Sequence, residues 1–424
     1  MWLVKYLIKY QLWLTFFLGP IILFPTVIPS LTIIAWVVLI ATWISRRLTQ
    51  GHFTHRTAVD ISLILLLLGL PINVWVSIDS MASLIALNRI LWGIVLFYAL
   101  VNNISTLQTL SVLLWVAVLA GIFIACVGLV ATDWRETKLT FLTPIYQHLP
   151  QLSNISGFLA SKTNQSTGFF HPNIIAITLS MIIPLAIGLL AVVKTQWQKG
   201  FLWVGLIWMG SILFLTQSRL ALVSLIMVLW FMSVTKQPKL WLLIPPGILA
   251  FIGFIVYTGP AIFWQRLTQA FLGTGTGSWQ SRLDVWQNAL HALSDFAFTG
   301  IGLSVFEPVS RMLYPYYVAG SDWHFRHAHN IFLQAGLDFG IVGLIAYIAL
   351  LMGLACLGWQ SYRIASEPLK GITIGISGSF GVYIGFGLFD CLPFWVKPGF
   401  IPWFVFGLLV ATHNIAQPAT KKDN

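Results

Sequence analysis

The sequence "RHAHNIFLQAGLDFGIVG", which runs from Arg326 to Gly343, joins a histidine-containing segment to a long apolar run. The run continues to about residue 357 and is longer than the roughly 20 residues that a transmembrane helix needs. Similar runs fill the rest of the chain, which is 58% hydrophobic and only 8% charged. Soluble domains carry about 25% charged residues. We therefore predict an integral membrane protein.

The apolar runs predict an all-α integral membrane protein with about twelve transmembrane helices. The predicted spans cover residues 11–28, 30–45, 58–77, 83–101, 109–131, 173–193, 201–216, 219–234, 240–257, 331–357, 371–389 and 399–414. No small-residue cleavage site follows a short apolar core near the N-terminus, so we expect 11–28 to be a first span rather than a removed signal.

Lysine and arginine residues indicate the orientation of these spans, because short cytoplasmic loops carry an excess of both. With the N-terminus in the cytoplasm, the inner segments hold Lys5, Lys9, Arg46, Arg47, Arg56, Lys194, Lys199, Lys236, Lys239, Arg363, Lys370, Lys421 and Lys422. The short outer loops hold few. The bias therefore predicts that both termini are cytoplasmic.

Two long segments lie on the predicted outer side, and they divide the chain into three regions. Residues 1–258 hold spans one to nine and a first outer loop at about 133–172. Residues 259–330 form a large outer loop with amphipathic helices, and residues 331–424 hold the last three spans and a short cytoplasmic tail. Extended loops in compact proteins tend to be functional. Both long loops face the same compartment.

The net charge of +11 does not indicate nucleic-acid binding, because the basic residues are scattered singly between apolar runs. The three cysteines, Cys126, Cys356 and Cys391, have no CxxC or metal-ligand spacing. We expect them to be packing residues.

Two arginines on the predicted outer side are candidate anion ligands. Arg219, in "LTQSRLALVSL", stands at a turn between two spans, where the charge bias disfavours a lone arginine. A charge at membrane depth usually faces a cavity or a partner, although a snorkelling side chain is the alternative. Arg282 and Trp286 are four residues apart in "GSWQSRLDVWQNALHALSD" and so share a helix face.

The helix that carries Arg282 is predicted to be amphipathic. Its apolar positions, spaced for one helical face, are Trp279, Leu283, Trp286, Leu290 and Leu293. Such a helix is expected to lie on the membrane or on the helix bundle.

The histidines around the opening stretch admit two interpretations. A single histidine at a helix start is ordinarily structural, whereas His324, His327 and His329 together raise the alternative of a zinc site. No cysteine and no clear fourth ligand is near them in the sequence. We therefore predict no metal ion and no other cofactor.

These motifs together resemble the O-antigen ligase family. His329-Asn330, nine residues and then Gly340-x-x-Gly343 is similar to that family's signature, and the Ser218-Arg219-x-Ala221 turn precedes it. "SRLDVWQNAL" with "TGIGLSVF" resembles the family's loop pattern, and "TGFFHPNIIAITL" resembles its segment entering the sixth span. The motifs cover residues 165–345, and the topology covers the whole chain.

The resemblance implies a fold of the membrane glycosyltransferase C type in a bacterial inner membrane, with the active site on the periplasmic face. It implies transfer of a glycan from undecaprenyl pyrophosphate to an acceptor hydroxyl, usually on lipid A–core. The expected partners are thus the lipid-linked glycan donor, a lipid A–core or glycan acceptor, and the bilayer, without nucleic acid.

The candidate residues suit this reaction chemically. His329 is predicted to take the proton of the acceptor hydroxyl, since histidine titrates near neutrality. Arg219 and Arg282 are predicted to hold the pyrophosphate, because a guanidinium carries a permanent charge and matches phosphate oxygens. The outer acids, Asp133, Glu136, Asp284, Asp295, Glu307, Asp322 and Asp390, are dispersed in the sequence. We therefore expect a metal-independent, inverting displacement.

Five further residues are weaker candidates for substrate binding. They are Arg326 and His327 beside the motif, Asn330, which either orients His329 or caps the following helix, Trp286, and Arg89. Arg89 lies about two turns inside the fourth span, where it either snorkels outward or touches the donor phosphate. His171 and Asn173 are expected to be structural.

Three other functions compete with ligation. A polymerase of the same family would use a second lipid-linked glycan as its acceptor, and attachment of glycans to proteins is a related reaction. A transporter for a small anion or solute would explain the spans and the arginines. It would also need ionisable groups at mid-membrane in paired broken helices. The sequence places its spanning-segment carboxylates, Asp60 and Asp338, near span ends instead.

Overall fold

The computed structural model describes residues 2–27, 29–132, 134, 143–148, 171–243, 253, 256, 257, 259, 279–315 and 325–417. Eleven of the twelve predicted spans coincide with an α-helix. These helices are α2 (Gln11–Leu23), α3 (Pro29–Gln50), α4 (Asp60–Trp75), α5 (Ser80–Asn103), α6 (Leu107–Ala131), α9 (Pro172–Leu189), α10 (Gln196–Leu215), α11 (Arg219–Lys236), α16 (Ile331–Ile364), α17 (Leu369–Gly387) and α18 (Phe400–Ala416).

Six further helical elements complete the described part of the chain, which contains no β-strand element. They are α1 (Trp2–Lys9), α7 (Thr143–His148), η2 (Pro238–Leu243), α14 (Trp279–Asp295), α15 (Phe306–Leu313) and η3 (Lys397–Gly399). The predicted span at 240–257 begins in η2, and the rest of it lies largely outside the described residues.

Nine helices in the described residues are long and apolar enough to cross a membrane, and α2 and α4 are shorter apolar helices. The chain is therefore an all-α, multi-pass membrane protein, which confirms the predicted class. The count of twelve spans stays a prediction.

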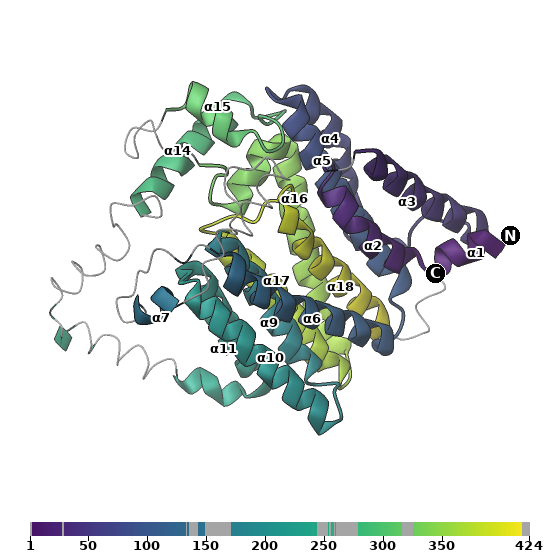
Figure 1. Cartoon of the computed structure of the whole chain (residues 1–424), viewed down its shortest axis with the longest axis vertical. Helices are drawn as coiled ribbons and strands as arrows, with labels where there is room; N and C mark the ends of the chain where they lie inside the picture. Colours follow the sequence, from purple (N-terminus) through teal and green to yellow (C-terminus); the bar gives the residue numbers. More distant parts are fainter. Residues whose placement is uncertain are drawn as a thin grey trace.

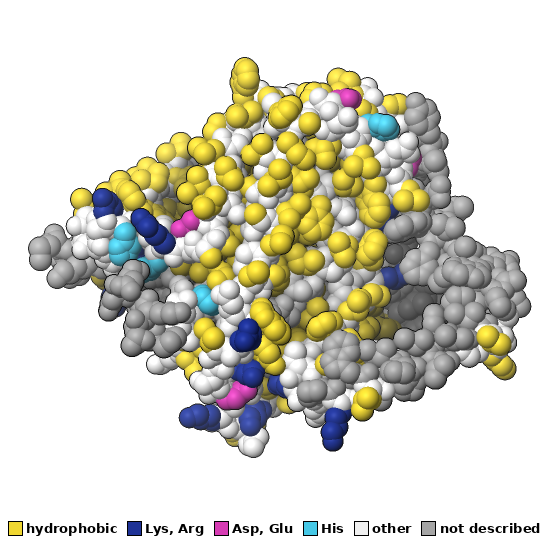
Figure 2. All heavy atoms as spheres, turned by 180° about the vertical axis from the view of Figure 1, so that it is seen from behind, with side chains coloured by type: hydrophobic (Ala, Val, Ile, Leu, Met, Phe, Trp, Pro, Cys, Tyr) yellow, Lys and Arg dark blue, Asp and Glu magenta, His cyan; other side chains and the backbone are white. Residues whose placement is uncertain are grey.

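Two groups of helices flank a central pair (Figure 1). α16 and α18 pack against each other, with α4 against α16 and α5 against α18 on one side. On the other side α17 packs against α9 and α11, and α9 packs against α6 and α10. α14 and α15 lie at one end of this bundle. Figure 2 shows hydrophobic side chains over the middle of one face, with most of its visible lysines and arginines toward the margins, as expected for a surface in contact with lipid.

Small residues let α9 and α17 approach closely. A Cβ atom on Gly375 would lie 2.6 Å from the carbonyl oxygen of Pro184 and 2.7 Å from the Cα of Gly188. Close backbone approach through small residues is a common way for helices to pack in membranes, where the hydrophobic effect does not drive helix association. The glycines therefore fix the distance between these two helices.

α16 is interrupted at Gly340, which has φ +70° and ψ −176°. The carbonyl oxygen of Phe298 lies where a Cβ atom on Gly340 would be. Only glycine adopts this conformation and tolerates this contact without strain. The break separates a first piece, which starts at Ile331, from the long apolar piece that follows.

The break connects α16 to the segment between α14 and α15. The Ile341 amide donates to the Ala297 carbonyl at 2.6 Å, and the Ile301 amide donates to the Leu337 carbonyl at 2.8 Å. α4 and α5 hold the same segment, because Asn73 Nδ2 donates to the Thr299 carbonyl at 2.7 Å and Ser83 Oγ donates to the Leu303 carbonyl at 2.7 Å. These bonds fix the position of α14 relative to the bundle.

α14 is the predicted amphipathic helix, but the predicted apolar face is only partly correct. Val285, Ala289 and Ala292 are fully buried, whereas Leu283 is 40% exposed and Leu290 is 56% exposed. The buried residues pack in a small core with residues such as Phe306, Val309, Phe325 and Leu337. α14 thus turns a face of small side chains toward α16 and leaves Leu283 and Leu290 largely outside.

We expect Gly375→Ala to destabilise the protein by about 1–3 kcal/mol, because the added methyl group collides with the backbone of α9. Gly210→Ala in α10 is the matched control, since nothing lies within 4 Å of its Cβ position and alanine favours a helix over glycine. Thermal melting in detergent compares them. Equal melting temperatures for the two variants would show that the α9–α17 contact is not tight.

Candidate active site

His329 lies at the start of α16 in a constrained backbone conformation. Its φ is +49°, in the left-handed region that residues other than glycine seldom adopt. The next residue, Asn330, caps α16: its Oδ1 accepts from the amides of Phe332 at 2.9 Å and Leu333 at 3.0 Å. Its Nδ2 donates to the Leu388 carbonyl at 2.9 Å. The capping alternative for Asn330 is thus the one that the structure shows.

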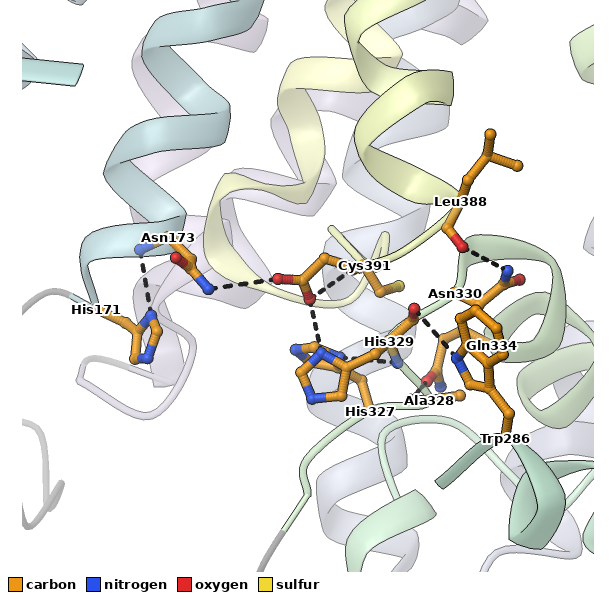
Figure 3. A network of polar contacts seen from close by, with 11 residues as sticks. His171, Asn173, Trp286, His327, Ala328, His329, Asn330, Gln334, Leu388 and Cys391 are labelled. Atoms are coloured by element: carbon orange, nitrogen blue, oxygen red, sulfur yellow. Dashed lines mark hydrogen bonds and ion pairs between the residues drawn. The ribbon is translucent and has the colours of Figure 1, made fainter. Parts of the chain in front are cut away.

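Asp390 is the direct partner of His329 (Figure 3). The His329 Nδ1 and Asp390 Oδ1 atoms are 2.8 Å apart, and the two side chains are 21% and 5% exposed. The carboxylate also accepts from the Cys391 amide at 2.9 Å and from Asn173 Nδ2 at 3.3 Å. Asp390 follows α17, 61 residues after His329. The fold thus brings one of the dispersed acids to the candidate base.

The environment of Asp390 keeps it ionised. Burial raises its pKa, but the neighbouring His329 charge and the hydrogen bond from that residue outweigh burial and hold the pKa well below its usual range. An ionised carboxylate only accepts hydrogen bonds, so we assign the Nδ1 proton to His329. The Nε2 atom then carries the lone pair, which makes it the basic atom of the ring.

His327 packs against His329. Its Nδ1 accepts from the His329 amide at 3.3 Å, and the ring centroids are 4.4 Å apart. Burial, followed by repulsion from the His329 charge, lowers the pKa of His327 to about 3. The His327 ring is therefore neutral at physiological pH and does not compete with Asp390 for the His329 proton.

The residues that could bind zinc in the structure differ from the three histidines considered in the sequence analysis. His327, His329 and Asp390 each offer one ligand atom, and these atoms lie within 4.8 Å of one another. Two imidazoles and a carboxylate are donors that zinc accepts. His324 lies outside the described residues. Metal independence stays a prediction that a chelator tests.

α14 brings Trp286 and Arg282 to the same place. Trp286 Nε1 donates to the His329 carbonyl at 3.4 Å, and its ring stacks on Phe389 with centroids 6.3 Å apart. Burial is the largest effect on the pKa of Arg282 and lowers it. The negative charge of Asp390 raises this pKa, and the positive charge of Arg219 lowers it further. Arg282 therefore lies within electrostatic range of both residues.

Arg219 is the first residue of α11 and follows a sharp turn at Gln217, which has φ +49°. The fold thus gathers Arg219, Arg282 and His329 from three helices that lie far apart in the sequence. It also gathers Asn173 and Asp390, and the sequence does not indicate the role of Asp390. Asn173 was expected to be structural, and its contact with Asp390 fits that expectation.

The other two candidates lie apart from this cluster or at its edge. Arg326 is exposed and directly precedes His327. Arg89 donates to the carbonyls of Leu23 and Trp395. It therefore belongs to the α2–α5 side of the bundle rather than to the Arg219–Arg282 side.

Residues 204–348 match the family model described as O-antigen ligase. This match supports the resemblance of the chain to the O-antigen ligase family. The matched residues include Arg219, Arg282 and His329, and they end inside α16 beyond the Gly340 break. No curated protein matches the chain. The match supports a membrane glycosyltransferase of the ligase or polymerase type.

We expect Asp390 to make stability dependent on pH. Its pKa is lower in the folded protein than the value of about 3.9 for a free aspartate. Its contribution to stability is therefore present above about pH 4 and is lost as the pH falls further. The difference in melting temperature between the parent and Asp390→Asn should shrink between pH 7 and pH 3. A difference that is constant over this range would contradict the lowered pKa.

Proposed function

We propose that the protein is an inverting, metal-independent glycosyltransferase that moves a glycan from undecaprenyl pyrophosphate to an acceptor hydroxyl, with O-antigen ligation to lipid A–core as its reaction. The observation that carries the proposal is the His329–Asp390 pair, at 2.8 Å, beside two arginines within the family-matched segment. The proposed location is a bacterial inner membrane, with cytoplasmic termini and the site facing the periplasm.

His329 is the proposed general base. The acceptor hydroxyl gives its proton to Nε2 while its oxygen attacks the anomeric carbon of the donor sugar. The bond between that carbon and the pyrophosphate oxygen breaks on the opposite side, so the configuration inverts. The imidazolium that forms is stabilised by the Asp390 carboxylate at Nδ1, in the way that an aspartate supports a catalytic histidine in other enzymes.

Arg219 and Arg282 are the proposed pyrophosphate ligands. The leaving group gains negative charge as the bond breaks, and fixed cations that wait for this charge lower the barrier. The two guanidiniums repel each other in the free protein, so a pyrophosphate between them relieves that repulsion. They provide the compensation that other sugar transferases obtain from a metal ion.

Neighbouring side chains shape the proposed substrate pocket. Arg326 is exposed next to the histidines and is placed to contact the acceptor. Trp286 offers an aromatic surface for a sugar ring. His327 and Asn330 act on the site through the backbone around His329.

A polymerase of the same family is the second candidate, because it would need the same base and the same pyrophosphate ligands. The two reactions differ only in the acceptor, which would be a second lipid-linked glycan. Protein glycosylation differs in the same way. A transporter is less well supported, since transport does not require a histidine held by a buried carboxylate.

Substitution of the three central residues should abolish transfer in a purified system with undecaprenyl-pyrophosphate glycan and lipid A–core. We expect His329→Ala to reduce the rate about 10²–10⁴-fold, the usual contribution of a general base. Arg219→Ala and Arg282→Ala should each reduce it about 10²–10³-fold, because each removes a stabilising donor. The assay measures glycan-bearing lipid A–core in nanodiscs.

Exposed residues of the same types on α14 and α15 provide the controls. His291→Ala and Arg311→Ala should keep the parent rate, since both side chains are exposed. Transfer should persist in EDTA. Loss of transfer in EDTA, with recovery on adding Zn²⁺, would favour the metal site at His327, His329 and Asp390. Growth of longer lipid-linked chains without lipid A–core product would identify a polymerase.

Asp390→Asn should reduce kcat about 10²–10⁴-fold with little change in KM, because an amide no longer fixes the Nδ1 proton or stabilises the imidazolium. Asn173→Ala removes only a 3.3 Å hydrogen bond to the same carboxylate and should have a much smaller effect. Steady-state kinetics with varied acceptor separate the two constants. Equal effects of the two substitutions on kcat would mean that Asp390 serves structure alone.

A further inference from the structure

A second pair of cations, Arg89 and Lys397, lies apart from Arg219 and Arg282. Arg89 Nε donates to the Leu23 carbonyl at 3.2 Å, and Nη1 donates to the Trp395 carbonyl at 3.0 Å. Lys397 follows Trp395 by two residues, and its Nζ lies 4.5 Å from the centroid of the Phe24 ring. Both cations therefore lie between the same two segments, the end of α2 and the start of η3.

No carboxylate among the described residues balances these two charges. No negatively charged group among the described residues acts on Arg89. The only described charged group that acts on Lys397 is the guanidinium of Arg89, which repels it. Buried charges are normally paired, because removing an ion from water costs several kcal/mol. Two half-buried cations that repel each other are therefore a site that an anion would stabilise.

The hydrogen bonds of Arg89 leave room for such an anion. Nε and Nη1 are held by backbone carbonyls, while Nη2 has no acceptor among the residues that the structure describes. Two nitrogens thus fix the guanidinium in place, and Nη2 remains to donate to an anion. A side chain that only snorkelled would direct its charge toward water, whereas Arg89 directs it toward the segment that holds Lys397.

We propose that Arg89 and Lys397 bind the phosphate group of an anionic membrane lipid. The site lies between the apolar helices α2 and α5 and the segment that leads into α18. Basic pockets between transmembrane helices are a known type of binding site for lipid head groups. The exposed part of Phe24 lies beside the ammonium and is suited to contact the lipid chains.

This site is separate from the proposed pyrophosphate site. The charges that act on Arg282 are those of Asp390 and Arg219, whereas Lys397 is influenced by Arg89. The segment from Asp390 to Lys397 lies between the two pairs, with His329 bound at one end and Arg89 near the other. A lipid at Arg89 and Lys397 is therefore not the leaving group of the transfer reaction, and the proposal does not depend on that reaction.

The segment also offers a path between the two sites. Trp395, whose carbonyl accepts from Arg89, donates from Nε1 to Asp338 Oδ2 at 2.8 Å. Gln334 Nε2 donates to Asp338 Oδ1 at 2.9 Å, and Gln334 Oε1 accepts from the Ala328 amide at 2.9 Å. Ala328 directly precedes His329. A lipid that fixes Arg89 would thus support the loop that positions the candidate base.

Native mass spectrometry of the full-length protein, delipidated in detergent and titrated with phosphatidylglycerol, tests the proposal. We expect one retained lipid that Lys397→Gln weakens about 5-fold and Arg89→Gln/Lys397→Gln weakens about 30-fold, as expected for losing one or two basic contacts with an anionic head group. Lys397→Gln is the milder variant, because its amino group makes no hydrogen bond to any residue that the structure describes. Arg311→Gln and Lys194→Gln are exposed controls and should bind like the parent.

The comparison ligands are phosphatidylcholine and inorganic phosphate at the same phosphate concentration. Phosphatidylglycerol should raise the melting temperature of the parent more than either ligand, and this difference should vanish in the double variant. Unchanged phosphatidylglycerol binding by a folded double variant would overturn the proposal. Equal stabilisation by inorganic phosphate and by phosphatidylglycerol would overturn the lipid assignment and indicate a site for free anions.

Discussion

The break in α16 at Gly340 is the constraint on which the candidate active site depends. A continuous helix would satisfy its own amide and carbonyl groups, but here the Ile341 amide and the Leu337 carbonyl bond to the segment at 297–301. Glycine is required because φ is positive and the Phe298 carbonyl occupies the place of a side chain. The break thus holds α14 where Trp286 reaches the His329 carbonyl and Arg282 approaches Asp390.

The apolar helices could be predicted from the sequence because each is a local property. Eleven of the twelve segments needed only an apolar run of sufficient length. The face that α14 buries could not be predicted in the same way, since the helix has two apolar faces. Periodicity identified the leucines, whereas the packing of α14 against α16 buried Val285, Ala289 and Ala292 instead. Which face is covered depends on a partner that lies elsewhere in the chain.

Some residues of the candidate site could likewise be predicted from the sequence, and others could not. His329, Arg219 and Arg282 stood out because charged or titratable groups beside apolar spans are uncommon. Asp390 did not, because a single acid after a span has no spacing that relates it to a histidine 61 residues earlier. Its role follows from how α17 and the start of α16 pack, which brings the ends of both helices together. Arg89 was visible in the sequence, but its partners, Leu23, Trp395 and Lys397, were not.

Asp390 has a balancing role in the electrostatics of the site. Without substrate, its charge offsets part of the repulsion between Arg282 and Arg219, and it also holds the Nδ1 proton of His329. In the proposed reaction, a pyrophosphate between the arginines would compensate their repulsion instead. The carboxylate would then be opposed by fewer cations and would hold the imidazole more firmly through Nδ1. Binding of the donor and positioning of the proposed base would in this way be coupled through one carboxylate.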